Sequence, residues 1–361
     1  MITKEDVNKI LSKYDLKKLC IGTIGSHSAL NILKGAKEEG FKTVCICKES
    51  DSIVYKKFAV ADEIIHINEF SELLKEDIQD KLRKLNTVLI PHGSFTAYLS
   101  TEQLTQSLHV PMFGNRKLLH FEAVREKQEQ WLRKAGLRLP KTFKKPEEID
   151  RLIIAKLPGA KGGKGYFLAA SFESFQRKVK QMIDRGLLTK ADVDNIYLQE
   201  YILGVNVYPH YFSSPLENEV EFFGVDKRYE SAVDIIGRIP AAEQLEIDIA
   251  PTYTIVGNFP LTLRESLLSE LMRMGDNVQK IAMELSSPGI IGPFCLEIAI
   301  TDNLEIYTFE ISARIVAGTN VGIGTSPYAY LKYGEGMYMG RRIAREIKMA
   351  LKQKRIQDVL T

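Results

Sequence analysis

The pattern of apolar runs changes near residue 120, and this change constrains the fold more than any other feature of the sequence. Before it, strand-like runs (KKLCIGTI, KTVCICKE, DEIIHI, NTVLIPH) alternate with helical stretches (SALNILKGAKEEG, FSELLKEDIQDKLRKL). Such alternation is typical of a parallel sheet with flanking helices. We therefore predict an N-terminal α/β domain over residues 1–122. The 361 residues of the chain leave room for at least one more domain.

The second half has a different pattern. A long amphipathic helix is predicted over 117–136, and strand-like runs then adjoin one another: RLIIAKL, YFLAAS, NIYLQEYI, VNVYPHYF and VEFFGVDKR. The runs PFCLEIAIT and LEIYTFEIS form an apparent hairpin, and helical stretches are inserted between the strands. This mixture predicts an α+β domain with antiparallel sheets over 123–361, whose small lobe covers about 140–205.

Composition excludes several classes of protein. The formal net charge is only +3, and no dense basic run with interleaved aromatic residues suggests a nucleic-acid partner. The four cysteines contain no CxxC spacing, which favours a reducing cytoplasm. The first residues, MITKEDVNKI, lack the apolar core of a signal peptide, and no apolar run approaches the roughly 20 residues that span a bilayer. We expect a cytoplasmic protein without membrane or nucleic-acid partners.

The stretch GAKGGKGYF lies between two strand-like runs and is dense in glycine. It is not a Walker A loop, because Lys164 stands where the second glycine of that motif belongs and a strand follows instead of a helix. Exposed backbone N–H groups and nearby ammonium groups favour phosphate oxygens. We predict a phosphate site formed by Lys156 on the incoming strand and by Gly159, Lys161, Gly162, Gly163, Lys164 and Gly165. The alternative is a flexible basic hairpin tip.

Two glutamates of the late hairpin form a second candidate site. If Asp302–Asn303 is the turn, Glu297 and Glu310 are diagonal neighbours on one face, with Cβ atoms within about 7–8 Å. The other face is apolar and would carry Leu296, Ile298, Tyr307 and Phe309.

Two carboxylates this close repel each other unless a cation lies between them, and magnesium takes oxygen ligands. The alternative is a pair of solvated strand glutamates. Arg314 could reach the same phosphates or pair with Glu310.

Two turns of the first domain suggest a separate acceptor site. GTIGSHSAL and IPHGSFTAYLS follow predicted strands, and the carboxyl ends of parallel strands are where open α/β sheets bind ligands. We predict that His27 and Ser94 contact a phosphorylated small molecule. Helix caps at Ser26 and Ser94 and a surface histidine are the alternatives. The absence of GxGxxG argues against a nicotinamide-dependent oxidoreductase.

The order of these features resembles the ATP-grasp fold, in which two lobes clamp ATP between sheets. The resemblance implies that Lys156 contacts the phosphates and that Glu297 and Glu310 hold magnesium (or manganese). It also implies an adenine-binding hinge over Gln199, Glu200, Tyr201 and Ile202, and we predict a further ATP contact at Tyr208. For the ribose our candidate is Glu230, and the alternative is an exposed charge at the end of a strand. The sequence departs from the fold's pattern in two places: Ser312 stands where an asparagine ligand is common, and Asn206 where an acidic residue is common.

Across nearly its whole length the chain resembles the archaeal FAICAR synthetases, which are formate-dependent ligases of purine biosynthesis. The matching stretches are GTIGSHSALNILKGAKEEGF, IPHGSFTAYL, PGAKGGKGYF, YPHYF, GNFPLTLRESLL, GPFCLEIA and FEISARIVAGTN. The resemblance implies that ATP and formate give formyl phosphate, which the amine of AICAR attacks to give FAICAR, ADP and phosphate. On the family pattern His27, Ser94 and Asn258 contact AICAR, and Lys156 and Arg314 are catalytic. From the sequence alone, the alternative is that Asn258 is a turn residue after Gly257.

Two other functions remain open from the sequence. Another ATP-grasp carboxylate–amine ligase would share Lys156, Glu297 and Glu310 but would differ in the turns of the first domain. A non-catalytic nucleotide sensor could lose a metal carboxylate, and this chain keeps both. Exposed strand edges in the second half lead us to expect a homo-oligomer.

Overall fold

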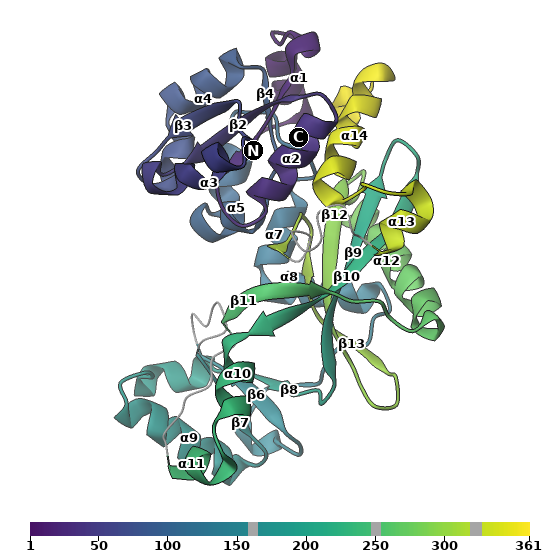
Figure 1. Ribbon diagram of the computed structural model, residues 1–361. Helices are drawn as coiled ribbons and strands as arrows, with labels where there is room; N and C mark the ends of the chain where they lie inside the picture. Colours follow the sequence, from purple (N-terminus) through teal and green to yellow (C-terminus); the bar gives the residue numbers. More distant parts are fainter. Residues whose placement is uncertain (158–164, 247–253, 318–326) are drawn as a thin grey trace.

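A computed structural model describes residues 1–157, 165–246, 254–317 and 327–361. The molecule has three parts (Figure 1): an N-terminal domain, a large antiparallel sheet, and a small lobe beyond the far end of that sheet. The loop residues Gly159, Lys161, Gly162, Gly163 and Lys164, predicted to bind phosphate, lie outside the described residues.

The N-terminal domain is the predicted α/β structure. Its parallel sheet has the order β3-β2-β1-β4. The strands are β1 (Cys20–Ile24), β2 (Lys42–Cys47), β3 (Glu63–His66) and β4 (Thr87–Leu89). The helices around the sheet are α1 (Lys4–Leu11), α2 (Ala29–Glu38), α3 (Ser52–Lys57), α4 (Glu76–Lys84), α5 (Gly93–Tyr98) and α6 (Thr101–Gln106). The helix predicted over FSELLKEDIQDKLRKL is divided, because a 3-10 turn over Phe70–Leu74 precedes α4.

The single helix predicted over 117–136 is also divided, into α7 (Leu118–Ala123) and α8 (Arg125–Lys134). Val124 is extended at the break. The Glu122 carbonyl there accepts a hydrogen bond from the side chain of Gln128 (3.0 Å). The Glu122 carboxylate accepts one from the backbone N–H of Ala313 (2.8 Å). Tertiary contacts therefore end the helix that the periodicity of the sequence would continue.

The large sheet is antiparallel and has the order β11-β10-β9-β12-β13. Its strands are β9 (Val205–Ser214), β10 (Glu219–Glu230), β11 (Ile255–Pro260), β12 (Gly292–Ile300) and β13 (Ile306–Ser312). The long helix α12 (Glu265–Leu285) packs against it, and the Tyr211 hydroxyl of β9 donates to the Leu271 carbonyl of that helix (2.8 Å). β11 was not predicted as a strand.

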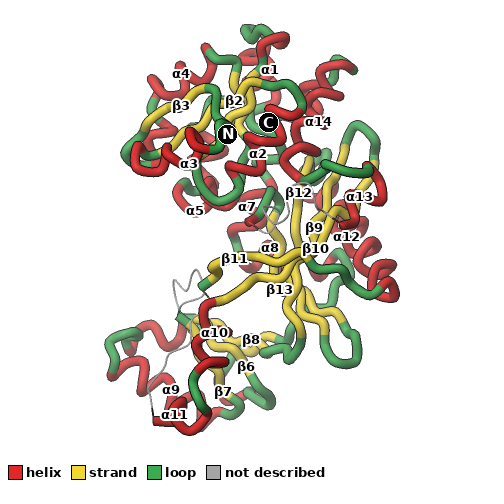
Figure 2. The backbone as a smooth tube through the Cα atoms, in the orientation of Figure 1, coloured by secondary structure: helices red, strands yellow, loops and turns green. Residues whose placement is uncertain are grey.

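The small lobe was predicted over about residues 140–205, and these bounds stay a prediction. Its antiparallel sheet has the order β5-β8-β6-β7. The strands are β5 (Thr142–Phe143), β6 (Ile153–Lys156), β7 (Tyr166–Ala169) and β8 (Tyr197–Glu200). The lobe also contains α9 (Phe172–Asp184), and the chain after β10 brings α10 (Ser231–Arg238) and α11 (Ala241–Glu246) beside it (Figure 2).

The end of the chain returns to the first domain. After α13 (Pro327–Tyr333), helix α14 (Met339–Lys352) lies against α2. The two helices cross closely because Gly35 and Gly340 face the other helix's backbone, where a Cβ atom on either would collide. Side chains of α14 and of the N-terminal domain, such as Ile347 and Ile21, belong to one hydrophobic core. The boundary near residue 122 stays a prediction, since this core joins both sides of it.

Candidate active site

A cleft of about 660 Å³ separates the small lobe from the large sheet. Ligand sites of small molecules commonly have this size. Nine residues predicted to bind ATP or metal line it: Lys156, Gln199, Glu200, Tyr201, Ile202, Tyr208, Glu230, Glu297 and Glu310. Segments that are far apart in the sequence therefore meet in one cavity, as the prediction requires, although their roles toward a ligand stay predictions.

Lys156 ends strand β6 on the small-lobe wall of the cleft. Its ammonium group donates to Gln199 Oε1 (3.0 Å) and lies 5.7 Å from the centre of the Tyr197 ring. Burial and the neighbouring Arg125 lower the pKa of Lys156, whereas the carboxylates of Glu310 and Glu297 raise it. A partly desolvated cation in this position favours an anionic ligand such as a phosphate group.

Gly165 is the one member of the predicted phosphate loop that the structure describes. It has a φ of +82°, which favours glycine, and its carbonyl accepts the backbone N–H of Leu157 (2.9 Å). This hydrogen bond holds the two ends of the loop together beside Lys156.

The predicted register of the hairpin was wrong. The Thr301 carbonyl accepts the Leu304 N–H (3.0 Å), as the predicted turn requires, but the Thr301 N–H donates to the Glu305 carbonyl (3.0 Å) instead of to Leu304, which has a φ of +62°. A bulge follows, so that Glu297 lies directly opposite Glu310. Directly opposed residues have Cβ atoms about 4.5–5.5 Å apart, closer than the predicted diagonal pair.

The bulge also moves Phe309. Its ring lines the cleft beside Glu310, whereas we predicted it on the apolar face.

The opposed carboxylates differ in their environments. Glu297 accepts a hydrogen bond from Arg228 (Nη2 to Oε1, 2.6 Å), and the Arg228 guanidinium lies 3.8 Å from the centre of the Tyr208 ring. Glu310 borders the open cleft, but desolvation by the cleft walls and the negative charge of Glu297 raise its pKa to about 8. At pH 7 Glu310 is therefore mostly protonated, and a divalent cation held by the oxygens of both carboxyl groups would favour its ionised form.

The predicted hinge lies at the back of the cleft. Gln199 is buried, and the Glu200 carboxylate accepts hydrogen bonds from the Lys141 backbone N–H (3.0 Å) and the Arg151 guanidinium (2.9 Å). The backbone N–H of Tyr201 donates to the Leu152 carbonyl (2.9 Å). These bonds fix the hinge to the small lobe, and they leave the Glu200 side chain occupied within the protein.

Arg228 and Asn206 line the cleft but were not predicted as functional residues. Arg228 lies two residues before Glu230 on β10, so strand alternation puts both on one face, and this spacing could have revealed it. Burial raises the pKa of Glu230, although Arg228 and Lys227 act in the opposite direction.

The predicted acceptor residues meet at the edge of the first domain. Ser94 donates its hydroxyl to Ser26 Oγ (3.0 Å), and His27 Nδ1 lies 3.0 Å from Ser28 Oγ. Neither Ser26 nor Ser94 caps a helix, because Ser28 and His92 take the N-cap positions of α2 and α5. Partial burial and the charges of Arg314 and Arg228 lower the pKa of His27 to about 4, so its imidazole is neutral at pH 7 even though part of the side chain is exposed, as the surface-histidine alternative expected.

Asn258 lies on β11 opposite Arg228, so the two residues share one face of the sheet. Its Oδ1 atom is buried and has no hydrogen-bond partner among the residues that the structure describes. An unsatisfied buried acceptor is costly without a ligand. Asn258 lies within a strand, so the sequence-based alternative that it is a turn residue was wrong.

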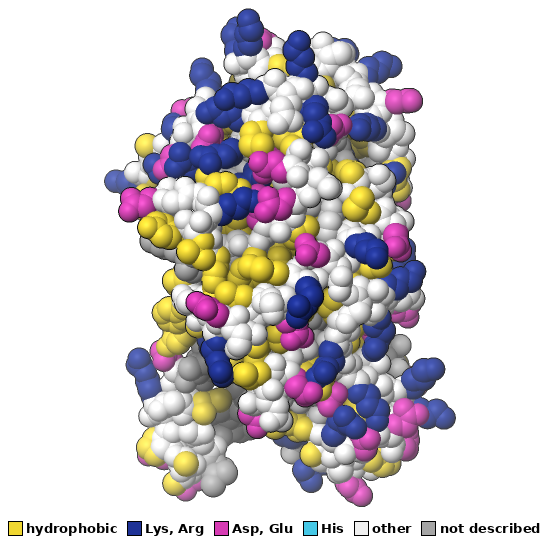
Figure 3. Space-filling view, turned by 90° about the vertical axis from the view of Figure 1, so that its right-hand side faces the viewer, with side chains coloured by type: hydrophobic (Ala, Val, Ile, Leu, Met, Phe, Trp, Pro, Cys, Tyr) yellow, Lys and Arg dark blue, Asp and Glu magenta, His cyan; other side chains and the backbone are white. Residues whose placement is uncertain are grey.

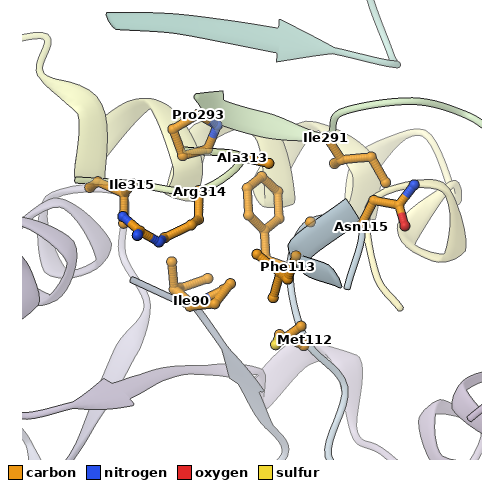
Figure 4. A pocket seen from close by; sticks show the side chains of 12 residues that line it. Ile90, Met112, Phe113, Asn115, Ile291, Pro293, Ala313, Arg314 and Ile315 are labelled. Carbon is orange, nitrogen blue, oxygen red and sulfur yellow. The ribbon is translucent and has the colours of Figure 1, made fainter. Parts of the chain in front are cut away.

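Arg314 lies between the two sites. Its guanidinium pairs with Glu122 (2.7 Å) and not with Glu310, which was one of the predicted alternatives. Figure 4 shows Arg314 at a small cavity that Ile90 and Phe113 also line. Its Nε atom is buried without a hydrogen-bond partner within the described part of the chain. Its positive charge lowers the pKa values of both Glu310 and His27.

A second cluster of acidic residues lies outside the cleft, at the start of β10, and has a structural role. Glu217, Glu219 and Glu221 have carboxylate oxygens close to one another, but Arg342 and Lys332 neutralise them through ion pairs. Figure 3 shows one face of the molecule, on which positively and negatively charged side chains are interspersed.

Solved structures share this architecture at low sequence identity. N5-carboxyaminoimidazole synthetase from Staphylococcus aureus complexed with ADP has a TM-score of 0.57 and 16% identity, over 83% of this chain and 71% of that chain. The biotin carboxylase–beta-gamma-ATP complex from Campylobacter jejuni has a TM-score of 0.60 and 13% identity, over 91% of this chain and 70% of that chain. The fold and the cleft define an ATP-grasp enzyme, as predicted.

Closer relatives establish the family. A 5-formaminoimidazole-4-carboxamide-1-(beta)-D-ribofuranosyl 5'-monophosphate synthetase from Archaeoglobus fulgidus is 51% identical over 99% of both chains. The protein of that name from Methanocaldococcus jannaschii is 49% identical over the full length of both. The chain belongs to this family of synthetases. The predicted family and the ligase class in purine biosynthesis are thereby confirmed.

Other comparisons agree with this placement. The crystal structure of the IMP biosynthesis protein PurP from Thermococcus kodakaraensis has a TM-score of 0.73 and 31% identity, over 94% of this chain and 100% of that chain. Two family models also match, described as Protein of unknown function (DUF1246) over residues 21–143 and Domain of unknown function (DUF1297) over residues 174–361. Within the described residues, no helix has the length and apolar character needed to cross a membrane.

Proposed function

We propose that this protein joins formate to the 5-amino group of AICAR at the expense of ATP, and releases FAICAR, ADP and phosphate. Formate is a poor acylating agent, and its phosphorylation supplies a good leaving group. The amine of AICAR then attacks the formyl carbon of formyl phosphate, the carbon–oxygen bond to phosphate breaks, and the amine loses a proton. The full-length identity to the named synthetases supports this reaction.

The observation that carries the proposal is the course of one short segment, Glu310–Val316. Glu310 lies in the cleft, and Arg314 follows between the two sites. Ile315 forms an isolated parallel β-bridge with His92, and the Val316 carbonyl accepts a hydrogen bond from the hydroxyl of Ser28 (3.2 Å). The same few residues therefore join the wall of the nucleotide cleft to the acceptor pocket, which suits transfer of a formyl group between them.

The cleft residues suit phosphoryl transfer. Lys156 binds the transferring phosphate as an ammonium donor, and the hinge residues Gln199–Ile202 hold the adenine. Glu297 and Glu310 would hold magnesium or manganese, and the ion would supply charge neutralisation on the transferring phosphoryl group. A closed cleft keeps water from the labile acyl phosphate. The glycine-rich loop, which lies outside the described residues, covers the phosphates in this proposal.

The acceptor pocket suits AICAR. His27, Ser94 and Asn258 bind the ribonucleotide, and Arg314 stabilises negative charge on formyl phosphate between the sites. The neutral His27 imidazole and the unsatisfied Asn258 oxygen support these roles, since both offer hydrogen bonding without added charge.

We further propose a cytoplasmic homo-oligomer that has no membrane or nucleic-acid partner. The four cysteines are free and buried, which suits a reducing compartment. β11 forms an edge of the large sheet and exposes Ile255, Val256 and Phe259 by 42%, 64% and 54%, which suits contact with a second copy.

The test is ADP release by the purified protein with Mg²⁺ and ATP, with formate and AICAR added singly and together. We expect ADP and FAICAR to form in equal amounts when both substrates are present. ADP without FAICAR would indicate an ATP-grasp ligase with another acceptor. ATP binding without any turnover would favour the nucleotide sensor.

A further inference from the structure

A second histidine lies directly behind the acceptor pocket. The side chain of His92 is fully buried, at 0% exposure. Its ring stacks on the His27 ring, with 5.6 Å between centroids and an interplanar angle of 2°. On another side, Phe95 meets the His92 ring edge-on at 5.4 Å and 89°. The His92 ring therefore forms a fixed flat surface against which the ring of His27, the more accessible of the two, packs.

Both nitrogens of His92 are held by the backbone. Nε2 lies 2.9 Å from the Ile24 carbonyl oxygen, which can only accept, so Nε2 carries the hydrogen. Nδ1 accepts the backbone N–H of Ser94 (3.2 Å) and thereby caps α5. One neutral tautomer satisfies both bonds, so ring position and tautomer are fixed together.

The same segment determines where the two acceptor residues lie. The bond from Ser94 N–H to His92 orients the turn of α5 that carries the Ser94 hydroxyl. Next to it, a Cβ atom on Gly93 would approach His27 Nε2 to 2.8 Å, so this position needs glycine for His27 to pack there. His27 itself has a φ of +52°, an uncommon conformation for a residue other than glycine, which the surrounding packing must hold.

We propose that His92 is a positioning residue for the acceptor substrate: it orients His27 and Ser94 for the ribonucleotide without touching the substrate itself. This inference rests on the proposed function, because it takes His27 and Ser94 as contacts of AICAR. A purely structural role as a helix cap is the competing interpretation, and the two can be separated because one side chain can preserve the cap and lose the stacking.

Two substitutions separate these roles. In His92→Asn, the amide oxygen can still accept the Ser94 N–H and cap α5, since asparagine is a preferred capping residue, but the surface behind His27 is lost. In His92→Gln, the amide nitrogen can still donate to the Ile24 carbonyl, while the acceptor for Ser94 is lost. The dissociation constants of AICAR and of ATP are measured separately by titration calorimetry, and thermal unfolding checks each fold.

We expect His92→Asn to raise the dissociation constant of AICAR about tenfold and to change that of ATP by less than about twofold. In a protein that already carries His27→Ala, His92→Asn should have little further effect on AICAR, because its influence passes through His27. The more conservative His92→Gln should affect AICAR in the same direction, and it serves as the test if His92→Asn does not fold.

Unchanged affinity for AICAR in a folded variant would overturn the inference, as would equal losses for AICAR and ATP. Full additivity with His27→Ala would also overturn it. A wild-type protein that binds ATP but not AICAR would overturn the proposed function instead, and the two failures are therefore distinguishable.

Discussion

The proposed nucleotide cleft and the proposed acceptor site differ in how far the protein itself satisfies their ionisable groups: Glu310 in the cleft is exposed, whereas His92, which lies behind the acceptor residue His27, is fully buried. In the cleft, Glu297 and Glu310 oppose each other, Arg228 donates to Glu297, and the pKa of Glu310 rises to about 8. Behind His27, His92 has both ring nitrogens hydrogen-bonded to the backbone, and burial lowers its pKa to about 3.

This difference indicates how each site meets its ligand. The cleft has an incomplete charge balance that a cation and a polyphosphate complete, so its free energy falls when they bind. The pocket is already assembled and neutral, so it presents shape and hydrogen bonds to its substrate at little cost in reorganisation. Perturbing the first site should therefore abolish chemistry, and perturbing the second should mainly weaken binding.

The largest effect that would test this comparison is expected for Glu310→Gln. It removes a proposed metal ligand and keeps the size and polarity of the side chain, so turnover should fall about 1,000-fold or more while the fold stays intact. ADP release and urea denaturation measure the two quantities. Glu305→Gln on the same hairpin is the matched control, since Glu305 is exposed and pairs with Arg138. Near-normal turnover in a folded Glu310→Gln variant would show that Glu310 is not a ligand of an essential metal.

Lys156→Met should lower turnover about 100-fold, because it keeps the length of the side chain and removes the buried ammonium group. Steady-state ADP formation at saturating ATP is the measurement. Lys144→Met, in the same lobe but outside the cleft, should behave as the wild type. If both variants lost activity equally, the loss would reflect a general disturbance of the small lobe and not the removal of the Lys156 charge from the cleft.

Because His92 is buried as a neutral ring, the stability of the folded protein should decrease in acid. The pKa of His92 is lowered from its ordinary 6.5, so between about pH 6.5 and pH 3 the unfolded chain takes up a proton that the folded chain does not. Stability from this group is therefore complete above pH 6.5 and falls as the pH decreases.

Relative to His92→Asn, the wild type should lose about 2 kcal/mol between pH 7 and pH 5. Urea denaturation of both proteins at the two pH values measures the difference in their free energies of unfolding. A difference that is the same at both pH values would mean that His92 is not buried as a neutral ring.

The smallest effect is expected for His27→Ala, which should raise the dissociation constant of AICAR about tenfold and leave that of ATP nearly unchanged. Calorimetric titrations with each ligand are the measurement, and His66→Ala, an exposed histidine at the end of β3, is the control. Equal losses for both ligands would mean that the acceptor pocket and the cleft are not separate sites.

Local sequence patterns predicted most of the secondary structure and several residues that line the cleft. Alternating apolar runs predicted the parallel sheet, and the two glutamates of the late hairpin were predicted as neighbours on one face, where they do lie, although in another register. What the sequence could not supply depends on contacts between distant segments. The break between α7 and α8 accompanies the bonds of Glu122 to Ala313 and Arg314, which directly follow β13.

The hairpin register escaped prediction for a similar reason. It depends on Leu304 adopting a positive φ and on a bulge opposite Glu297, and neither has a strong sequence signal. The ion pair between Arg228 and Glu297 joins strands that only the finished sheet brings together. His92 could have been noted in IPHGSF, but its role depends on a stacked ring from another turn.

The return of α14 to the first domain bears on how the chain is made. The core beneath α2 is completed by Ile343, Ile347 and Leu360, which a ribosome adds after almost everything else. The emerging N-terminal domain therefore keeps an apolar face uncovered for most of synthesis. During that interval it is open to chaperones and to aggregation, and its folding finishes together with that of the whole enzyme.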